Sequence, residues 1–265
     1  YNLNIHMNHP PSPHGDPTKF VFLRAWLSTP DWIFRALGAG IFLMYAITRM
    51  QGYFVSFPDI GPYWTPPSGE GARSYFPAAK ILADLTFLLI ALSFCFRIPP
   101  RKRATKAREI VIPIIAGFWP LFPFMLLAIL LAASSEWAAP LRQALEFGAI
   151  GYERFLVGII LLSVGNSLDV WGYATLFRSF SIVAEARELK VTGPYRFVRH
   201  PVYLGQLMAQ AGIWLVLLET HLVWILFYIA FVTIQLYRAR IEDEVLAEAF
   251  GEQYRSWKRR TFWIP

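Results

Sequence analysis

Long apolar runs alternate with short polar segments along most of the chain. The runs are Trp32–Ile47, Ala79–Phe96, Ile110–Ala133, Ile150–Leu168, Tyr203–Leu218 and Leu222–Tyr237. Each approaches the roughly 20 apolar residues that a helix needs to cross a bilayer. The pattern therefore predicts an all-α polytopic membrane bundle with about six transmembrane helices. A count of five is the alternative, because Arg35 and Arg49 would allow the first run to lie flat on the membrane surface.

Two features of these runs predict more detail. The third run contains Pro113, Pro120 and Pro123, so we expect a helix that is kinked or locally unwound. Only residues 219–221 separate the fifth run from the sixth. So short a connection predicts a tight antiparallel helical hairpin, which brings the polar ends of its two helices side by side.

Composition supports a membrane protein. Of the 265 residues, 55% are apolar and 16% are charged, whereas a soluble domain has about 25% charged residues. This excludes a soluble enzyme, a disordered protein and a disulfide-built module, for which the single cysteine would also be insufficient. The net charge of +7 could suggest nucleic acid. In a membrane protein it more often marks loops at the cytoplasmic face, so no nucleic-acid partner is expected.

Lys and Arg are distributed unevenly between the predicted loops. Six lie in residues 97–108, five in 178–200 and six after Tyr237, whereas 51–74 and 134–151 hold one each. Six spans would put the three rich segments on one side of the membrane and the two poor segments on the other. The positive-inside rule then places both termini in the cytoplasm. We expect an integral protein of a bacterial inner membrane.

Polar residues within the later runs predict where a substrate binds. We divide the chain into residues 1–150, which hold the first three spans, and a core of residues 151–265. Four polar residues of the core recur at helical spacing inside apolar runs: Asn166 and Asp169, then Gln206 and Gln210. Such groups usually face a cavity or the interior of a bundle, so they are candidates for a substrate pocket. Hydrogen bonding between helices is the competing interpretation.

The start of the fifth run predicts an anion site. Gly193 and Pro194 indicate a turn. Pro201 suits the first position of a helix, because its missing N–H costs nothing there. His200 would then cap this helix, and the free N–H groups at a helix start favour a carboxylate or phosphate. Arg199 strengthens that preference.

A second polar block, with Arg240, Glu242 and Asp243, follows the last run. Because the hairpin is tight, this block must lie close to Arg199 and His200. Carboxylates buried among arginines cost several kcal/mol unless each is paired, so we expect a functional cavity there. A solvated acidic helix is the competing interpretation.

From Leu189 onward, the chain resembles the isoprenylcysteine carboxyl methyltransferase family. The pattern is Gly-Pro-Tyr-Arg-x-x-Arg-His-Pro-x-Tyr-x-Gly, followed by an acidic pair, Phe-Gly-x-x-Tyr and a closing Trp-Ile-Pro. That family belongs to a wider group of membrane methyltransferases that includes the phospholipid N-methyltransferases. Residues 1–150 show no comparable similarity and could serve as a scaffold, select the substrate or dock on a partner.

The resemblance implies S-adenosylmethionine as methyl donor, with S-adenosylhomocysteine as product, in a cytoplasmic pocket at the end of the last hairpin. With it we assign cofactor binding to Gly193, Tyr195, His200, Pro201, Tyr203 and Glu242, and catalysis to Arg199, Arg240 and Glu242. We expect His200 and Glu242 to share the wall of one nucleoside-sized hollow, where a tyrosine face such as that of Tyr203 would suit the sulfonium. Asp243 stands where the family usually has a second Glu. We therefore expect Asp243→Asn to weaken donor binding less than Glu242→Gln does.

The sequence therefore predicts a membrane methyltransferase that acts on a lipophilic carboxylate, amine or thiol entering from the bilayer. The expected partners are membrane lipids and a lipophilic or lipidated substrate. The alternative is a non-catalytic subunit that uses the hairpin as a scaffold within a larger membrane complex. A transporter is poorly supported, because the halves of the chain do not repeat. We interpret His6, His9 and His14 as part of a Pro-rich tail, so no metal site is expected.

Overall fold

The computed structural model describes residues 21–55, 72–145, 151–217 and 222–262. These residues form helices joined by loops and turns. The main elements are α1 (Val21–Ser28), α2 (Asp31–Val55), α3 (Ala72–Phe96), α4 (Ala107–Phe118), α5 (Phe122–Ala133), α6 (Ser135–Ala144), α7 (Tyr152–Leu176), α8 (Pro201–Ala211), α9 (Leu222–Phe250) and α10 (Glu252–Lys258). Short helical turns are η2 (Trp119–Leu121), η3 (Phe177–Ser179), η4 (Gly193–Arg196) and the π-helical η5 (Gly212–Leu217). Within these ranges the structure contains no β-strand, only two isolated β-bridges. The predicted all-α class is confirmed.

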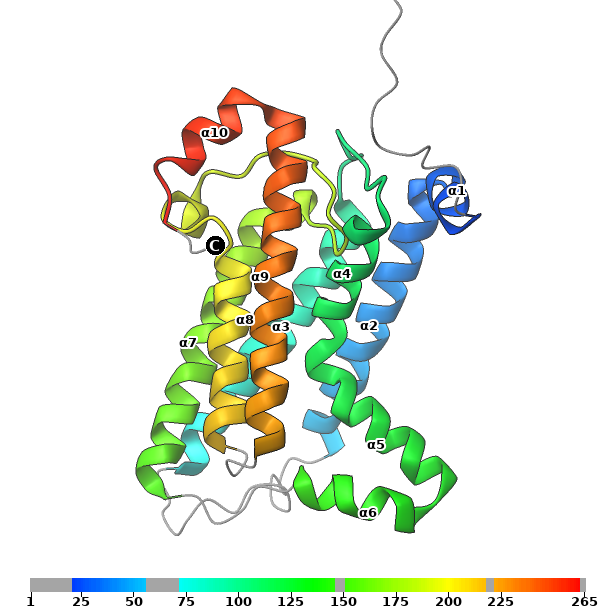
Figure 1. Cartoon of the computed structure of the whole chain (residues 1–265). Helices are drawn as coiled ribbons and strands as arrows, with labels where there is room; N and C mark the ends of the chain where they lie inside the picture. The colour runs from blue at the N-terminus through cyan, green and yellow to red at the C-terminus, as the bar shows by residue number, and fades with distance from the viewer. Residues whose placement is uncertain (1–20, 56–71, 146–150, 218–221, 263–265) are drawn as a thin grey trace, which may run out of the picture.

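Apart from Gly151, the described residues of each predicted apolar run are helical. The third run is divided into α4 and α5 by the 3-10 turn η2, which contains Pro120. The expected interruption is therefore confirmed, and Figure 1 shows α5 leaving the direction of α4. The last run is longer than expected, because α9 continues without a break from the apolar residues through Arg238 and Asp243 to Phe250.

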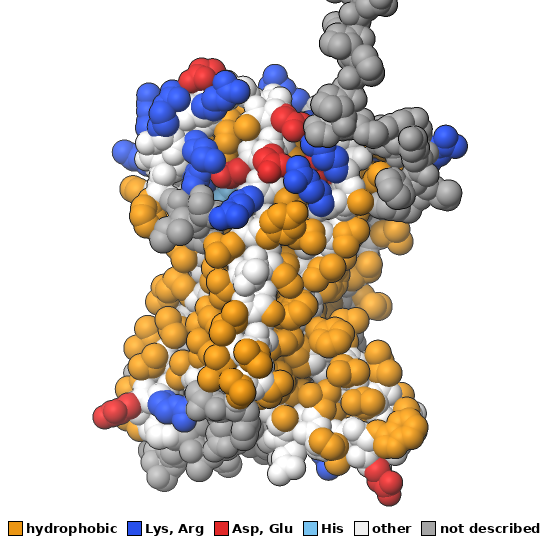
Figure 2. Space-filling model, viewed as in Figure 1, with side chains coloured by type: hydrophobic (Ala, Val, Ile, Leu, Met, Phe, Trp, Pro, Cys, Tyr) orange, Lys and Arg blue, Asp and Glu red, His pale blue; other side chains and the backbone are white. Residues whose placement is uncertain are grey.

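The length and surface of the helices support an integral membrane protein. In the described part of the chain, four stretches are long and apolar enough to cross a bilayer: Asp31–Thr48, Ala107–Ala133, Tyr152–Ser179 and Leu222–Phe250. Ile81–Phe96 is a shorter apolar helix. Apolar side chains cover the flank of the bundle, whereas charged side chains gather at the end near α10 (Figure 2). The total of six spans stays a prediction.

The helices α7, α8 and α9 form the part of the bundle that positions the site (Figure 1). Tyr228 on α9 donates to the carbonyl of Leu207 on α8 at 3.0 Å, and His200 reaches Asp243 at the other end. From the first contact to the second, the residue numbers fall on α8 and rise on α9. The two helices are therefore antiparallel. The connecting turn of the predicted hairpin, residues 219–221, lies outside the described residues, as do His6, His9 and His14.

Glycines allow α7 and α8 to approach closely. A Cβ added to Gly165 would lie 2.5 Å from both the backbone nitrogen of Ala209 and the carbonyl oxygen of Gly205. Small residues at such crossings let membrane helices pack through their backbones. The register of α8, and with it the position of His200, therefore depends on this contact.

Gly165→Ala is expected to destabilise the detergent-purified protein by about 1–3 kcal/mol, because the added methyl group must push the backbone of α8 away. Thermal unfolding, followed by helical circular dichroism, measures the loss. Gly40→Ala is the matched control, since a Cβ at that position in α2 meets nothing within 4 Å. Equal midpoints for the two variants would contradict the close α7–α8 packing.

The Arg- and Lys-rich segment after α3 is fastened to the loop that precedes α8. Backbone hydrogen bonds link Lys102 to Ala186 in both directions at 3.0 Å, and Ala184 donates to the carbonyl of Glu109 at 2.9 Å. The cations also form ion pairs, including Arg108 with Glu244 on α9. The segment, which sequence reasoning treats as a signal of topology, is thus part of the frame around the candidate site.

Candidate active site

The local structure at the start of α8 is as predicted. Pro201 occupies the first turn of the helix and His200 is its N-cap residue. The side chain of His200 does not cap the helix. Its imidazole instead points across to α9, where Nε2 lies 2.8 Å from Asp243 Oδ1. The histidine therefore connects α8 to α9 through two side chains that lie 43 positions apart in the sequence.

Asp243 is the centre of a charged cluster at this end of the bundle. Its Oδ2 accepts hydrogen bonds from Arg199 Nη1 at 3.1 Å and from Lys258 Nζ at 3.0 Å. Its Oδ1 accepts from the hydroxyl of Tyr254 as well as facing His200. The carboxylate is buried and fully engaged, so it fixes the positions of the surrounding side chains.

Glu242, the neighbour of Asp243, points in another direction. Its carboxylate accepts a hydrogen bond from the hydroxyl of Tyr203, and Oε2 lies 3.8 Å from His200 Nδ1. The glutamate side chain keeps 30% of its surface exposed, against 9% for that of Asp243. Glu242 is therefore the carboxylate of this pair that can contact a ligand.

The ring of Tyr203 is engaged by other protein groups. His200 stacks on it at 5.2 Å between ring centroids, and the guanidinium of Arg238 lies 4.7 Å above the ring. The expectation that this tyrosine face receives a sulfonium stays a prediction. Tyr203 acts through its hydroxyl, which holds Glu242.

Two adjoining cavities lie beside this cluster. The inner hollow is lined by Glu185, Arg187, Tyr195, Arg199, His200 and Glu242 among others, and has a volume of about 40 Å³. His200 and Glu242 thus share a wall as predicted, but the hollow alone is far smaller than a nucleoside. The hollow is therefore smaller than expected; loop residues before α8, together with Leu176 of α7 and Glu242 and Leu246 of α9, line it.

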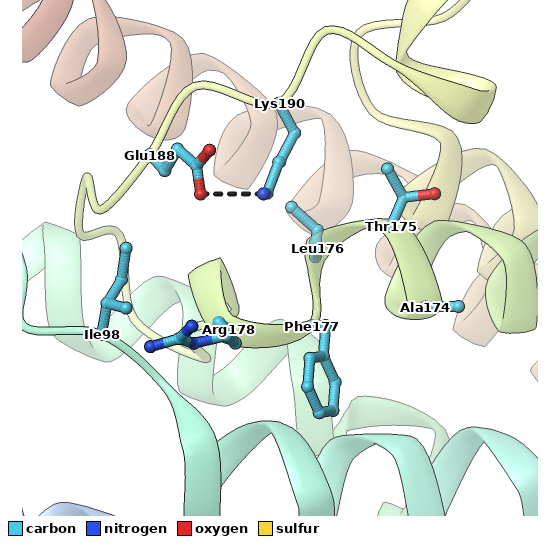
Figure 3. Close-up of a pocket in the computed structure, with 8 residues that line it drawn as sticks. All are labelled: Ile98, Ala174, Thr175, Leu176, Phe177, Arg178, Glu188 and Lys190. Carbon is cyan, nitrogen blue, oxygen red and sulfur yellow. Dashed lines mark ion pairs between the residues drawn. The ribbon is translucent and has the colours of Figure 1, made fainter.

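The outer pocket supplies more space. It has a volume of about 350 Å³ and lies between the ends of α3 and α7 and the loop before α8, as Figure 3 shows. Leu176, Glu188 and Lys190 line both cavities. Glu188 and Lys190 form an ion pair of 2.8 Å, and this bond keeps the pKa of Glu188 below its ordinary value. Together the cavities reach the range of about 300–1,000 Å³ typical of ligand sites.

Burial affects two tyrosines beside the cluster. It raises the pKa of Tyr195, which lies in η4, well above its ordinary value. The pKa of Tyr254 is also raised, first by burial and then by the hydrogen bond to Asp243. Both phenols therefore stay protonated at neutral pH. Tyr254 acts as a hydrogen-bond donor to Asp243.

Glycines shape the loops that bring these residues together. Gly193 has φ of +56°, and a Cβ there would lie 2.7 Å from Thr175 Oγ1. Gly251 has φ of +54° and joins α9 to α10. That turn folds α10 back so that Tyr254 and Lys258 reach Asp243. Of the residues assigned to cofactor binding, Gly193 thus has a demonstrable role in backbone geometry.

The predicted substrate-pocket residues lie deeper, among the helices. Gln206 donates to the hydroxyl of Tyr173 at 3.1 Å, and Gln210 accepts from Trp214. Asn166 and Asp169 are buried on α7, and Asp169 Oδ1 has no hydrogen-bond partner within the described ranges. None of the four predicted residues lines the inner hollow or the outer pocket. Their role in substrate binding stays a prediction.

Arg240 does not join the cluster. It is exposed, whereas Arg238 is buried and donates to the carbonyl of Ile182 at 3.0 Å. Residues two positions apart on a helix differ by about 200° in direction, so only one of these arginines can face α8. A catalytic role for Arg240 has no support from its placement.

Several residues that build the site escape sequence reasoning. Glu185 and Arg187 line the inner hollow, and Tyr254 and Lys258 complete the Asp243 cluster. The Phe-Gly-x-x-Tyr motif contained the signal for Tyr254. The loop residues gave none, because their role depends on contacts with distant segments.

The fold and the site define an all-helical membrane protein with an enzyme-like cluster of imidazole, carboxylates and guanidinium at the charged end of its bundle. Residues 153–253 match the family model described as phospholipid methyltransferase. The matched part of the chain runs from α7 through α9, and the model it matches belongs to the wider group of membrane methyltransferases that the motifs predict. The match implies a methyltransferase that acts on a lipid. A search of curated proteins found no match to the chain.

Proposed function

We propose that the protein transfers a methyl group from S-adenosylmethionine to a lipophilic acceptor at the charged end of the bundle. The observation that carries the proposal is the convergence of His200 and Glu242 on one hollow, within the segment that matches phospholipid methyltransferase. A scaffold has no need for a partly exposed carboxylate such as that of Glu242 at the wall of a hollow.

The lining of the cavities fits the charged groups of this donor. The partly exposed carboxylate of Glu242 suits an ammonium or sulfonium cation, and Arg187 and Arg199 offer guanidinium groups for a carboxylate. The outer pocket provides the volume that the inner hollow lacks. When bound, the donor would supply an electrophilic methyl group, which would pass to the acceptor as its bond to sulfur breaks and S-adenosylhomocysteine leaves.

The contribution of the chain to such a reaction is positioning, which can supply much of the rate enhancement of a displacement. Tyr203 holds Glu242, and Asp243 holds His200, so neither wall residue has to be ordered when a ligand arrives. Residues on both helices are already paired, and this preorganisation lowers the entropic cost of binding.

The location and partners follow from the same proposal. The Lys- and Arg-rich end, with both chain termini, would face the cytoplasm, in a bacterial inner membrane for which the positive-inside rule holds. Membrane lipids would surround the apolar flank, and the acceptor would enter from them. Residues 151–265 would form the methyltransferase core, and residues 1–150 would support it.

Calorimetry of the detergent-purified wild-type protein tests the proposal. S-adenosylhomocysteine is expected to bind with measurable heat, because the hollow presents groups for both of its amino-acid charges. Adenosine triphosphate is the matched control, since it shares the nucleoside but lacks the methionine portion. The absence of heat with S-adenosylhomocysteine would overturn the proposal and favour a non-catalytic subunit of a membrane complex.

A further inference from the structure

The first residue of α2 links the part of the chain outside the family match to the candidate site. Asp31 Oδ1 lies 2.8 Å from Arg97 Nη2 and 3.6 Å from Arg187 Nη2. Its second oxygen accepts from Arg35 Nε at 2.8 Å. Asp31 thus contacts its own helix, the end of α3 and the loop before α8.

Arg187 carries this link to the inner hollow. Its side chain is fully buried, and its Nη1 donates to the carbonyl of Ile98. Its Nη2 donates to Glu185 Oε2 at 2.8 Å. Glu185 and Arg187 both line the inner hollow beside His200 and Glu242. We call the segment Glu185–Arg187 the loop wall.

Arginines outnumber carboxylates around Asp31, which pairs with Arg35, Arg97 and Arg187. Two buried arginines, Arg97 and Arg187, face the carboxylates of Asp31 and Glu185. Burial, followed by repulsion from Arg187, lowers the pKa of Arg97 to about 10, and the two carboxylates oppose that shift. Like charges in a poorly hydrated place repel strongly, so removal of one carboxylate forces an arginine to move.

We propose that Asp31 is a positioning residue for methyl transfer, which neutralises Arg97 and Arg187 and thereby keeps the loop wall against the inner hollow. The inference rests on the proposed function. It gives the first half of the chain a direct role in the site, in addition to any role in docking or scaffolding.

Two measurements on the full-length protein test this role. Asp31→Asn is expected to weaken binding of S-adenosylhomocysteine about tenfold, because Arg187 loses a charged partner. Hydrogen exchange is expected to increase in peptides that cover residues 183–190. Arg35→Met is the matched control, since it removes only the half-buried pair within α2 and leaves Arg97 and Arg187 in place.

A double variant that leaves the net charge of the protein unchanged separates positioning from a general loss of stability. Asp31→Asn combined with Arg97→Met leaves Arg187 with Glu185, so affinity and exchange are expected to return to within about threefold of wild type. Faster exchange with unchanged affinity would show a merely structural role and overturn the inference. Unchanged exchange in Asp31→Asn would also overturn it. If the wild type binds no S-adenosylhomocysteine, the proposed function fails, and the exchange data still decide whether Asp31 orders the loop wall.

Discussion

Glu242→Gln is expected to weaken binding of S-adenosylhomocysteine by roughly 30- to 100-fold, which corresponds to the loss of about 2–3 kcal/mol from a charge-assisted contact. The carboxylate lines the inner hollow, and its protein hydrogen bond comes from the neutral hydroxyl of Tyr203. The amide oxygen of Gln can still accept that bond. What disappears is the negative charge available to an ammonium or sulfonium group.

The same reasoning predicts that the fold survives this substitution. We expect the thermal midpoint of Glu242→Gln to stay within about 2 °C of wild type. Glu244→Gln is the matched control, because Glu244 is exposed on the same helix and pairs with Arg108 away from the hollow. Calorimetry and a methyl-transfer assay with labelled donor measure the two variants. Equal donor affinity in both would rule out contact between Glu242 and the donor.

Asp243→Asn is expected to have its largest effect on stability. The substitution leaves the buried guanidinium of Arg199 without its carboxylate, and breaking a buried ion pair costs about 3–5 kcal/mol. For a chain of this size we expect a fall of about 5–15 °C in the thermal midpoint. Glu248→Gln is a suitable control, because Glu248 is half exposed and its ion pairs with Lys102 and Lys106 lie at the surface.

Donor binding by the folded fraction of Asp243→Asn provides a second comparison. Asp243 contacts His200 and Arg199 but does not line the inner hollow. Its substitution should therefore weaken binding less than Glu242→Gln does. The reverse order, measured by calorimetry below the unfolding range, would show that Asp243 and not Glu242 carries the charge that the donor requires.

The motif residues illustrate how much of the site a single sequence can predict. The turn at Gly193, the helix start at Pro201 and the meeting of His200 with the acidic block all follow from local rules and the short link between two apolar runs. Helix rotation was not predictable. The sequence favours Arg240, whereas Arg238 is the arginine that faces α8, and it ranks Asp243 below Glu242, although Asp243 is the most connected carboxylate of the cluster.

The all-α class, the apolar runs and the methyltransferase motif are properties of the sequence by itself, because apolar length and residue spacing act over a few turns of one helix. Only the tertiary structure decided that Asp31 meets Arg187, that Gly251 folds Tyr254 onto Asp243, and that the hollow beside His200 is small. These contacts join segments whose relative rotation and depth are set by packing. No local pattern encodes that packing.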